Sequence, residues 1–320
     1  VFQNNSHLHY VKTFNEKGFV FAPFDDKKPT VLFPLAQSIQ ESEEVFAERN
    51  VLNSVQKDSV KCNSSKKKHV ALVKKGLEAI QEGQFKKVII SRKEEVELSD
   101  FNLISVFNKL LLNYLDAFVY VWYHPKVGLW MGATPETLLR VRDGAFSTVS
   151  LAGTQKFSSS TGVTWEEKEI EEQKLVTEYI VSNLAKVCST ISRNKTETVK
   201  AGDLLHLQTK IHAVLKPGNS ELSEVLKIIH PTPAVCGLPK KESKVFILEN
   251  ENYDRSFYTG FLGELNIEQE SNLFVNLRCM EISNNTADIY IGGGITKGSV
   301  PELEWEETVA KSQTMKKVLS

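Results

Sequence analysis

Two pairs of glutamates have a spacing that suits metal chemistry. Glu169 and Glu172 lie three residues apart in an acidic segment, and Glu304 and Glu307 lie three apart near the C-terminus. If each segment is helical, the members of a pair share one helix face and point at one place. Mg²⁺ prefers oxygen ligands, typically one or two carboxylates together with water and a substrate oxygen. The spacing therefore allows a magnesium site, but acidic residues at a helix start also favour the macrodipole without any metal.

Three other side chains have the chemistry of a catalytic or anion-binding group. Lys87 lies in a strand-like run in which it and Arg92 point to opposite faces. A lysine that faces a dry pocket can act as a base, whereas one that reaches solvent does not. Arg278 lies in an apolar run, where its guanidinium needs an anion, either a bound carboxylate or an internal salt-bridge partner. His206 is either a catalyst or a hydrogen-bonded core histidine.

Three consecutive glycines could let backbone groups bind a ligand. They are Gly292, Gly293 and Gly294, which follow a strand-like run and precede the last predicted helix. Residues without side chains let an anionic ligand approach backbone N–H groups closely, although such a triplet also serves as a tight connection. The spacing does not match a dinucleotide-binding fingerprint. The four cysteines are far apart and form no CxxC pair, which favours reduced thiols and argues against a zinc site.

The composition is that of a globular protein without a strong charge of either sign. Hydrophobic residues make up 41% of the 320 residues and charged residues 25%, and 39 Lys and Arg nearly balance 40 Asp and Glu. This balance argues against nucleic acid or an anionic membrane as a partner. No apolar run is long enough to span a bilayer and the sequence shows no signal peptide, so we expect a cytoplasmic protein. The missing initiator Met suggests that the first segment is trimmed.

Hydrophobic periodicity predicts the elements that must position these side chains. A basic stretch rich in Ser and Asn at 57–68 is expected to be a solvated loop before the first helix. The predicted helices cover residues 69–82, 101–115, 164–190, 220–228, 240–248 and 302–319. After short strands and loops in 1–60, the predicted strands cover residues 86–96, 117–122, 128–131, 146–151, 196–199, 257–267, 272–282 and 287–292.

Strands dominate both ends of the chain, and helices and strands do not alternate strictly. No repeat or low-complexity linker divides the sequence. The pattern therefore predicts one α+β domain over 1–320 with large, mostly antiparallel sheets. Residues 257–294 carry the late strands and their turns, so we expect the two ends of the chain to share one core.

Ten segments taken together resemble the chorismate-utilising enzymes, and among these the isochorismate synthases. They occur in family order from about residue 70 to the C-terminus, and residues 1–60 carry no comparable signature. The segments are KVIISR (87–92), GATPE (132–136), LAGT (151–154), 169–177, HLQT (206–209), HPTPAVCGLPK (230–240), RSFYTG (255–260), NLRC (276–279), GGGI (292–295) and EWEETVAK (304–311). Each motif alone is weak, and it is their order along the chain that identifies the family.

The resemblance implies a fold in which two large antiparallel sheets pack together with helices outside. It also implies Mg²⁺-dependent conversion of chorismate to isochorismate, in which water attacks C2 of the ring, the C4 hydroxyl leaves and the double bonds shift. At the matching positions, Lys87 would be the general base that deprotonates water, and Glu136 the general acid that protonates the departing hydroxyl. A base and an acid at opposite ends of the reacting system suit the exchange of one oxygen for another.

The resemblance also assigns a metal site and a substrate site. Glu172 and Glu307 match direct Mg²⁺ ligands, while Glu169 and Glu304 match acids that reach the metal through water. The metal would hold the ring carboxylate of chorismate. Many relatives have Glu-His where this chain has Glu172-Gln173, and a shift of one turn would move the ligand role to Glu169. The positions that match substrate-binding ones are Gly153, Thr154, His206, Ala234, Tyr258, Arg278, Gly292, Gly293, Gly294 and Lys311.

Within the family, two residues favour water as the nucleophile. Anthranilate-forming relatives generally have Gln at the position of Lys87, and aminodeoxychorismate-forming relatives have a lysine at the position of Ala152. No glutamine-amidotransferase partner is therefore implied, and a monomer is the default expectation. The product could feed menaquinone or siderophore synthesis. Two alternatives remain: a salicylate synthase, which also eliminates pyruvate, and a non-catalytic binding protein with the same fold.

Overall fold

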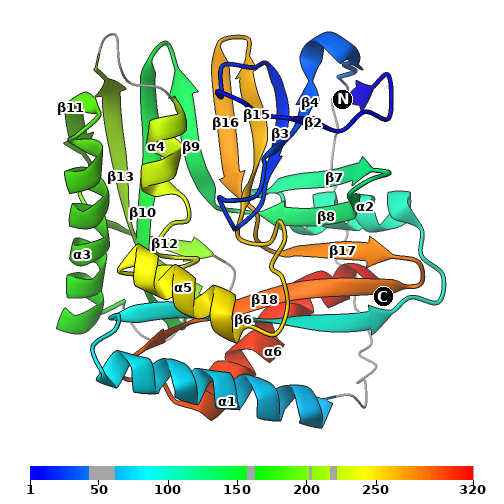
Figure 1. The fold of residues 1–320 in the computed structure, drawn as a ribbon. Coiled ribbons are helices and arrows are strands. Elements are labelled where there is room, and N and C mark those ends of the chain that lie inside the picture. Colours follow the sequence, from blue (N-terminus) through cyan, green and yellow to red (C-terminus); the bar gives the residue numbers. More distant parts are fainter. Residues whose placement is uncertain (43–61, 157–162, 202–203, 217–221, 320) are drawn as a thin grey trace.

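The strands form a ten-stranded sheet and a six-stranded sheet, with helices on the outside (Figure 1). The computed structural model describes residues 1–42, 62–156, 163–201, 204–216 and 222–319. Neighbouring strands in both sheets run antiparallel, from the long β6–β18 and β10–β13 pairs to the short N-terminal ones. The α+β class and the antiparallel sheets predicted from the sequence are thus confirmed.

The six-stranded sheet carries the strand that begins with Lys87. Its order is β14-β6-β18-β17-β8-β7. Its members are β6 (Lys87–Glu97), β7 (Phe118–His124), β8 (Gly128–Thr134), β14 (Gly237–Leu238), β17 (Cys279–Ser283) and β18 (Thr286–Thr296). The register of β6 with β18 places Lys87 opposite Thr296 and Ser91 opposite Gly292. The glycine triplet is therefore the interior of a strand beside the lysine strand, not a connection between elements.

The ten-stranded sheet contains strands from both ends of the chain. Strand β3 pairs with β15, with Gly18 opposite Leu265 and Ala22 opposite Phe261. Its members are β2 (His9–Tyr10), β3 (Gly18–Ala22), β4 (Val31–Pro34), β9 (Thr137–Arg142), β10 (Ala145–Lys156), β11 (Cys188–Arg193), β12 (Glu197–Ala201), β13 (Leu204–Leu215), β15 (Phe261–Ile267) and β16 (Glu270–Val275). A separate pair is formed by β1 (Phe2–Gln3) and β5 (Ser38–Ile39), next to the short 3₁₀ turn η1 (Leu35–Gln37).

Helices cover the outer sides of both sheets. Those found in the described residues are α1 (Cys62–Gln81), α2 (Leu103–Asn113), α3 (Glu167–Leu184), α4 (Leu222–Ile229), α5 (Lys240–Asn250) and α6 (Pro301–Leu319). Helix α3 packs on β10 and α4, while α1 and α6 contact each other and the six-stranded sheet (Figure 1). None of these helices is long and apolar enough to cross a membrane.

Two predicted boundaries of helices were wrong. Helix α1 already begins at Cys62, so the basic stretch at 57–68 is mostly not a loop, and its residues 57–61 lie outside the described part. Lysine has a good helix propensity, so a run of exposed lysines can continue a helix. The helix expected at 164–190 ends at Leu184, and Cys188–Arg193 form β11 against β13, where β-branched residues suit a strand.

The strand expected at 272–282 is two strands in different sheets. Strand β16 ends at Val275 in the ten-stranded sheet, and β17 begins at Cys279 in the six-stranded sheet. The intervening residues cross from one sheet to the other, and Arg278 has a φ of 47°, in the left-handed region. Arg278 therefore lies at the junction of the two sheets and not within a strand.

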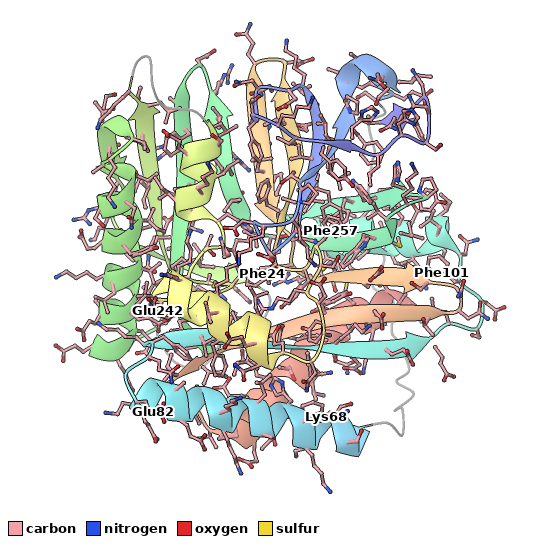
Figure 2. The ribbon with its side chains drawn as sticks, in the orientation of Figure 1. Phe24, Lys68, Glu82, Phe101, Glu242 and Phe257 are labelled. Atoms are coloured by element: carbon pink, nitrogen blue, oxygen red, sulfur yellow. The ribbon has the colours of Figure 1, made fainter. Side chains whose placement is uncertain are left out.

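Aromatic side chains fill the space between the two sheets. Phe21 of β3 stacks on Phe257 with ring centroids 4.1 Å apart, and meets Trp130 of β8 edge-on at 5.9 Å. Figure 2 shows Phe257 and Phe24 near the centre of the molecule, whereas Glu82 lies at the outer edge beyond α1. Because each such ring buries about 150–250 Å² when enclosed, these contacts dominate the packing of one sheet on the other.

A buried ion pair ties β6 to the loops around α5. Arg255 binds Glu251 in bidentate fashion, at 2.7 Å from Nε to Oε2 and 2.6 Å from Nη2 to Oε1, and both side chains are 2% exposed. Arg255 also donates to the carbonyls of Ile89 in β6 and Val235, at 2.8 and 3.0 Å, and to the Thr259 hydroxyl at 3.3 Å. The pair therefore fixes β6 against the loops that precede and follow α5.

Replacing Glu251 by glutamine is expected to lower the free energy of unfolding by about 3–5 kcal/mol, because the buried Arg255 guanidinium loses its counterion. Unfolding in urea at neutral pH measures this loss. Glu178→Gln is the control, since Glu178 pairs with Arg193 at the surface, where the two side chains are 50% and 51% exposed. We expect little change there. Equal losses in the two variants would contradict a special role of the buried pair.

Candidate active site

Lys87 of β6 and Glu172 of α3 meet in an ion pair. The Lys87 ammonium donates to Glu172 Oε1 at 2.9 Å, and the two side chains are 15% and 25% exposed. Gly294 on the neighbouring strand makes room for this pair, since a β-carbon there would be 3.2 Å from Lys87 Cε. Arg92 points away from Lys87 and contacts α6, as strand alternation predicts. The structure thus brings the candidate base to one of the candidate metal ligands.

Glu136 lies half-buried between β8 and β9. Burial raises the pKa of Glu136 to about 7, and the positive charge of Lys87 opposes this rise. Its backbone carbonyl accepts a hydrogen bond from Val275 N at 2.9 Å, which holds the segment against β16. A carboxyl group that titrates near neutral pH beside a lysine has the properties of a general acid next to a general base.

Gly153, Glu169 and His206 meet where β10 approaches α3. Gly153 has a φ of 67° at a bulge in β10, and a β-carbon there would be 3.2 Å from Glu169 Cβ. Glycine alone suits both this conformation and this close approach. His206 of β13 donates from Nδ1 to the Gly153 carbonyl at 3.2 Å, because a carbonyl oxygen only accepts. Burial lowers the pKa of His206, so its imidazole is neutral at neutral pH.

Helix α6 presents two carboxylates and a lysine to β18. A β-carbon on Gly293 would be 3.4 Å from Glu304 Oε2 and 3.9 Å from Glu307 Oε1, so both carboxylates lie over that glycine. Lys311 pairs with Glu307 at 2.6 Å and donates to the Gly292 carbonyl at 3.2 Å. The helix thus brings Glu304 and Glu307 to one place, as their spacing predicts.

Tyr258 and Arg278 reach this region from loops between strands. The Tyr258 ring stacks on Tyr290 at 5.5 Å, and its hydroxyl is 2.9 Å from where a β-carbon on Gly292 would lie. Arg278 is half-buried, burial lowers the pKa of its guanidinium, and no carboxylate in the described part of the chain pairs with it. Burial is the main cause of the lowered pKa of His206. The positive charges of Lys311, Lys87 and Arg278 lower that pKa further. Arg278 therefore lies near the other site residues and lacks an anion.

Two other predicted substrate-binding residues are Ala234 and Thr154. Ala234 lies half-exposed on the loop before β14, and two residues later the Cys236 carbonyl accepts a hydrogen bond from Ile89 N at 2.8 Å. The loop therefore runs beside the strand of Lys87. The side chain of Thr154 lies outside the described part of the structure, although its backbone continues β10 beyond the bulge.

The four glutamates predicted as metal ligands come in pairs from α3 and α6. Among the described residues, no three His, Cys, Asp or Glu side chains lie close enough together to form a ready metal site. Glu172 and Glu307 each bind a lysine instead. The donors are all carboxylate oxygens, which suit a hard cation such as Mg²⁺. These ion pairs use Oε1 of each carboxylate, so a cation that bound through Oε2 would share the carboxylates with the lysines.

The ion pair of Glu251 and Arg255 behind the site does not follow from the motifs. Ser91 links the pair to β6, because Ser91 N and Oγ both donate to Glu251 Oε1, at 2.7 and 2.8 Å, and Ser91 lies opposite Gly292 of β18. The sequence signal for the pair is an acid four residues before a base. That spacing is just as common on exposed helix faces, so it does not reveal burial.

Comparison with known proteins agrees with this arrangement. A sequence model of the chorismate binding enzyme family matches residues 21–320. Isochorismate synthase MenF of Pasteurella multocida is 29% identical over 263 residues, which cover 77% of this chain and 60% of that protein. The first curated relatives are covered over 60%, 57% and 59% of their length, so the chain spans about three fifths of them.

Solved structures share the fold. A putative 2,3-dihydroxybenzoate-specific isochorismate synthase, DhbC, from Bacillus anthracis has a TM-score of 0.76 and 27% identity, over 95% of this chain and 84% of that chain. The menaquinone-specific isochorismate synthase MenF from Escherichia coli has a TM-score of 0.77 at 23% identity, over 94% and 79% of the two chains. Since the family match includes every predicted site residue from Lys87 to Lys311, this chain belongs to the chorismate binding enzyme family.

Proposed function

We propose that this chain is an isochorismate synthase, which adds water at C2 of chorismate, releases the C4 hydroxyl and shifts the double bonds of the ring. The observation that carries the proposal is the position of Lys87, ion-paired to Glu172 and close enough to Glu136 to influence its pKa. Lys87 can accept a proton once its ammonium is deprotonated, and Glu136 can donate one at neutral pH. The names of the relatives from Pasteurella multocida and Bacillus anthracis support the same activity.

Lys87 is the general base in this proposal. The ammonium of the ion pair first releases a proton to solvent, and the neutral amino group then takes a proton from the attacking water while the water oxygen bonds to C2. The product of that transfer is an ammonium, and Glu172, whose Oε1 is 2.9 Å from Lys87 Nζ, is positioned to hold it. Glu172 therefore stabilises the charge that develops on the base. Because water is the nucleophile, no ammonia-supplying subunit is needed.

Glu136 is the general acid. Its carboxyl group gives a proton to the C4 hydroxyl as the C–O bond breaks, and the hydroxyl leaves as water. Burial, which raises the pKa of Glu136 to about 7, keeps protonated carboxyl available at neutral pH. One water enters and one leaves, so the reaction is an isomerisation. Return of the proton from Lys87 to Glu136 restores the starting state.

The cations around His206 would hold the carboxylates of chorismate. Arg278 can bind a carboxylate in bidentate fashion, and its lack of a carboxylate partner in the described chain leaves it available for one. Lys311 adds a second positive charge, oriented by Glu307 and by the Gly292 carbonyl. Because His206 is neutral, it contributes hydrogen bonding without further repulsion among these cations.

We also propose Mg²⁺ as the cofactor, held by Glu172 and Glu307, with Glu169 and Glu304 reaching it through water. When bound, the ion would supply positive charge for the ring carboxylate of chorismate and fix its orientation. The contribution of the chain is to position its carboxylates. Helix α3 brings one pair to Lys87 and Gly153, and α6 brings the other pair to Gly293.

The test is incubation of the purified protein with chorismate, with and without Mg²⁺, followed by chromatographic separation of the products and a parallel pyruvate assay. We expect isochorismate to form only when Mg²⁺ is present, without release of pyruvate. The reaction should reach the same equilibrium mixture when it starts from isochorismate, because one C–O bond forms for each one that breaks and the isomerisation is reversible.

Two outcomes would contradict the proposal. Salicylate together with an equal amount of pyruvate would assign the same site to a salicylate synthase. If no chorismate is consumed, the remaining alternative is a non-catalytic binding protein with this fold. Equilibrium dialysis with chorismate would then measure that binding.

A further inference from the structure

Helix α6 has two faces that contact different parts of the molecule. Glu304 and Glu307 lie over Gly293, whereas Trp305 and Thr308 are buried, with exposed fractions of 5% and 0%. Successive residues of an α-helix are rotated by about 100° around its axis. A small rotation of α6 would therefore carry both carboxylates away from Gly293. Whatever holds the buried face determines where the carboxylates point.

Arg92 of β6 holds that buried face in two ways. Its Nε donates to Thr308 Oγ1 at 2.8 Å, and its guanidinium carbon lies 4.5 Å from the centre of the Trp305 ring. Arg92 is itself only 7% exposed. A planar guanidinium can stack on an indole and donate a directed hydrogen bond at the same time, which an ammonium cannot do. One side chain thus defines the orientation of a full turn of α6.

Two further residues extend this contact. Arg92 Nη1 pairs with Glu94 at 2.8 Å, and Glu94 also pairs with Lys316 near the end of α6. His69 of α1 lies against Trp305, with ring centroids 5.8 Å apart. Burial, and then the charge of Arg92, lower the pKa of His69 to about 4, so its neutral ring does not repel the guanidinium. Glu94 therefore links Arg92 to the end of α6, and His69 supports the indole on which Arg92 stacks.

We propose that Arg92 is a positioning residue, which sets the rotation of α6 so that Glu304 and Glu307 face Gly293. This inference rests on the proposed function, in which those glutamates hold Mg²⁺. Arg92 does not touch the site, since it lies on the opposite face of β6 from Lys87. A single strand thus carries the base on one face and orients the carboxylate helix from the other.

The test compares Arg92→Met, Thr308→Val and the double variant with the wild-type protein. Methionine keeps much of the apolar stem but removes the charge and the directed donor, and valine keeps the shape of threonine without its hydroxyl. Lys93→Met is the matched control, because it removes a positive charge from the next position, where Lys93 pairs with Asp288 at 2.9 Å. Mg²⁺ binding is measured by isothermal titration calorimetry without substrate. The kcat, the KM for chorismate and the unfolding midpoint are measured alongside.

We expect Arg92→Met to weaken Mg²⁺ binding and to lower kcat, each by about 10- to 100-fold, as is usual when a residue that orients metal ligands is lost. Thr308→Val should act in the same direction, and the double variant should be no worse than Arg92→Met, because both changes remove one interaction. Arg92→Lys should not restore either property. Lys93→Met should bind Mg²⁺ and turn over like the wild type.

A purely structural role predicts a different pattern. Variants that unfold at lower temperature but bind Mg²⁺ and turn over normally while folded would overturn the proposal, and so would additive effects of the two substitutions. Should Arg92→Met fail to fold, Thr308→Val alone decides, since it removes the acceptor of the hydrogen bond from Arg92 and, besides that, only the hydroxyl's own bond to the Trp305 carbonyl within the helix. If the wild-type protein forms no isochorismate, the proposed function fails, while the calorimetric comparison still decides the role of Arg92.

Discussion

Replacing Lys87 by alanine is expected to lower kcat for isochorismate formation by about 10²- to 10⁴-fold, the usual contribution of a general base. The side chain that would accept the proton of water is removed, and Glu172 loses the group that it binds at 2.9 Å. The KM for chorismate should change less, because Arg278 and Lys311 keep their positions. Steady-state kinetics with product chromatography measures both constants.

Lys86→Ala is the control for this experiment. Lys86 is the preceding residue in the chain, its side chain is exposed, and strand alternation turns it away from Glu172. Its removal changes the net charge by the same amount and should leave turnover unaffected. Normal turnover by Lys87→Ala, in a protein that unfolds at the wild-type temperature, would show that the base lies elsewhere.

Several parts of this site could be predicted because local rules determine them. The i, i+3 spacing of Glu304 and Glu307 is sufficient to place both carboxylates over one glycine, as the structure shows. Strand alternation is sufficient to separate Lys87 from Arg92. In both cases the relevant geometry is contained within one helix or one strand, so the order of residues decides it.

The remaining parts depend on how separate elements meet. A continuous apolar run around Arg278 gives no sign that the chain passes from one sheet to the other there, because buried strands of both sheets have the same composition. The glycine triplet was expected to follow a strand, either as an anion-binding backbone or as a tight connection, but it lies within β18 and pairs with the strand of Lys87. The contact of Arg92 with Thr308 joins residues 216 positions apart, which no local pattern reveals.

Glu136→Gln is expected to lower kcat by a factor similar to that for Lys87→Ala, because an amide has no proton to give to the departing hydroxyl. In the wild-type protein the carboxyl must be protonated to act, and its pKa is about 7. The value of kcat/KM should therefore fall about tenfold per pH unit above that pH. In the glutamine variant kcat/KM should not fall in this way above about pH 7. If the fall persists in that variant, another group causes it.

The raised pKa of Glu136 also predicts an effect on folding that needs no substrate. Its pKa rises from 4.5 to about 7 on folding, so the folded state binds the proton more tightly than the unfolded chain between these pH values. The stability that this proton contributes is fully present below about pH 4.5 and is lost as the pH rises through about 7. Across that window, the free energy of unfolding should fall for the wild type relative to Glu136→Gln. A difference that stays constant with pH would contradict the shift.

The same measurement shows whether the acid and the base share one site. The positive charge of Lys87 opposes the rise in the pKa of Glu136, so its removal in Lys87→Ala should raise that pKa further. The pH window over which stability is lost should then extend to higher pH, with the variant Lys87→Ala/Glu136→Gln as its reference. Lys86→Ala should leave the window in place. If Lys87→Ala also leaves the pH window unchanged, Lys87 and Glu136 are too far apart to act on the two ends of one chorismate.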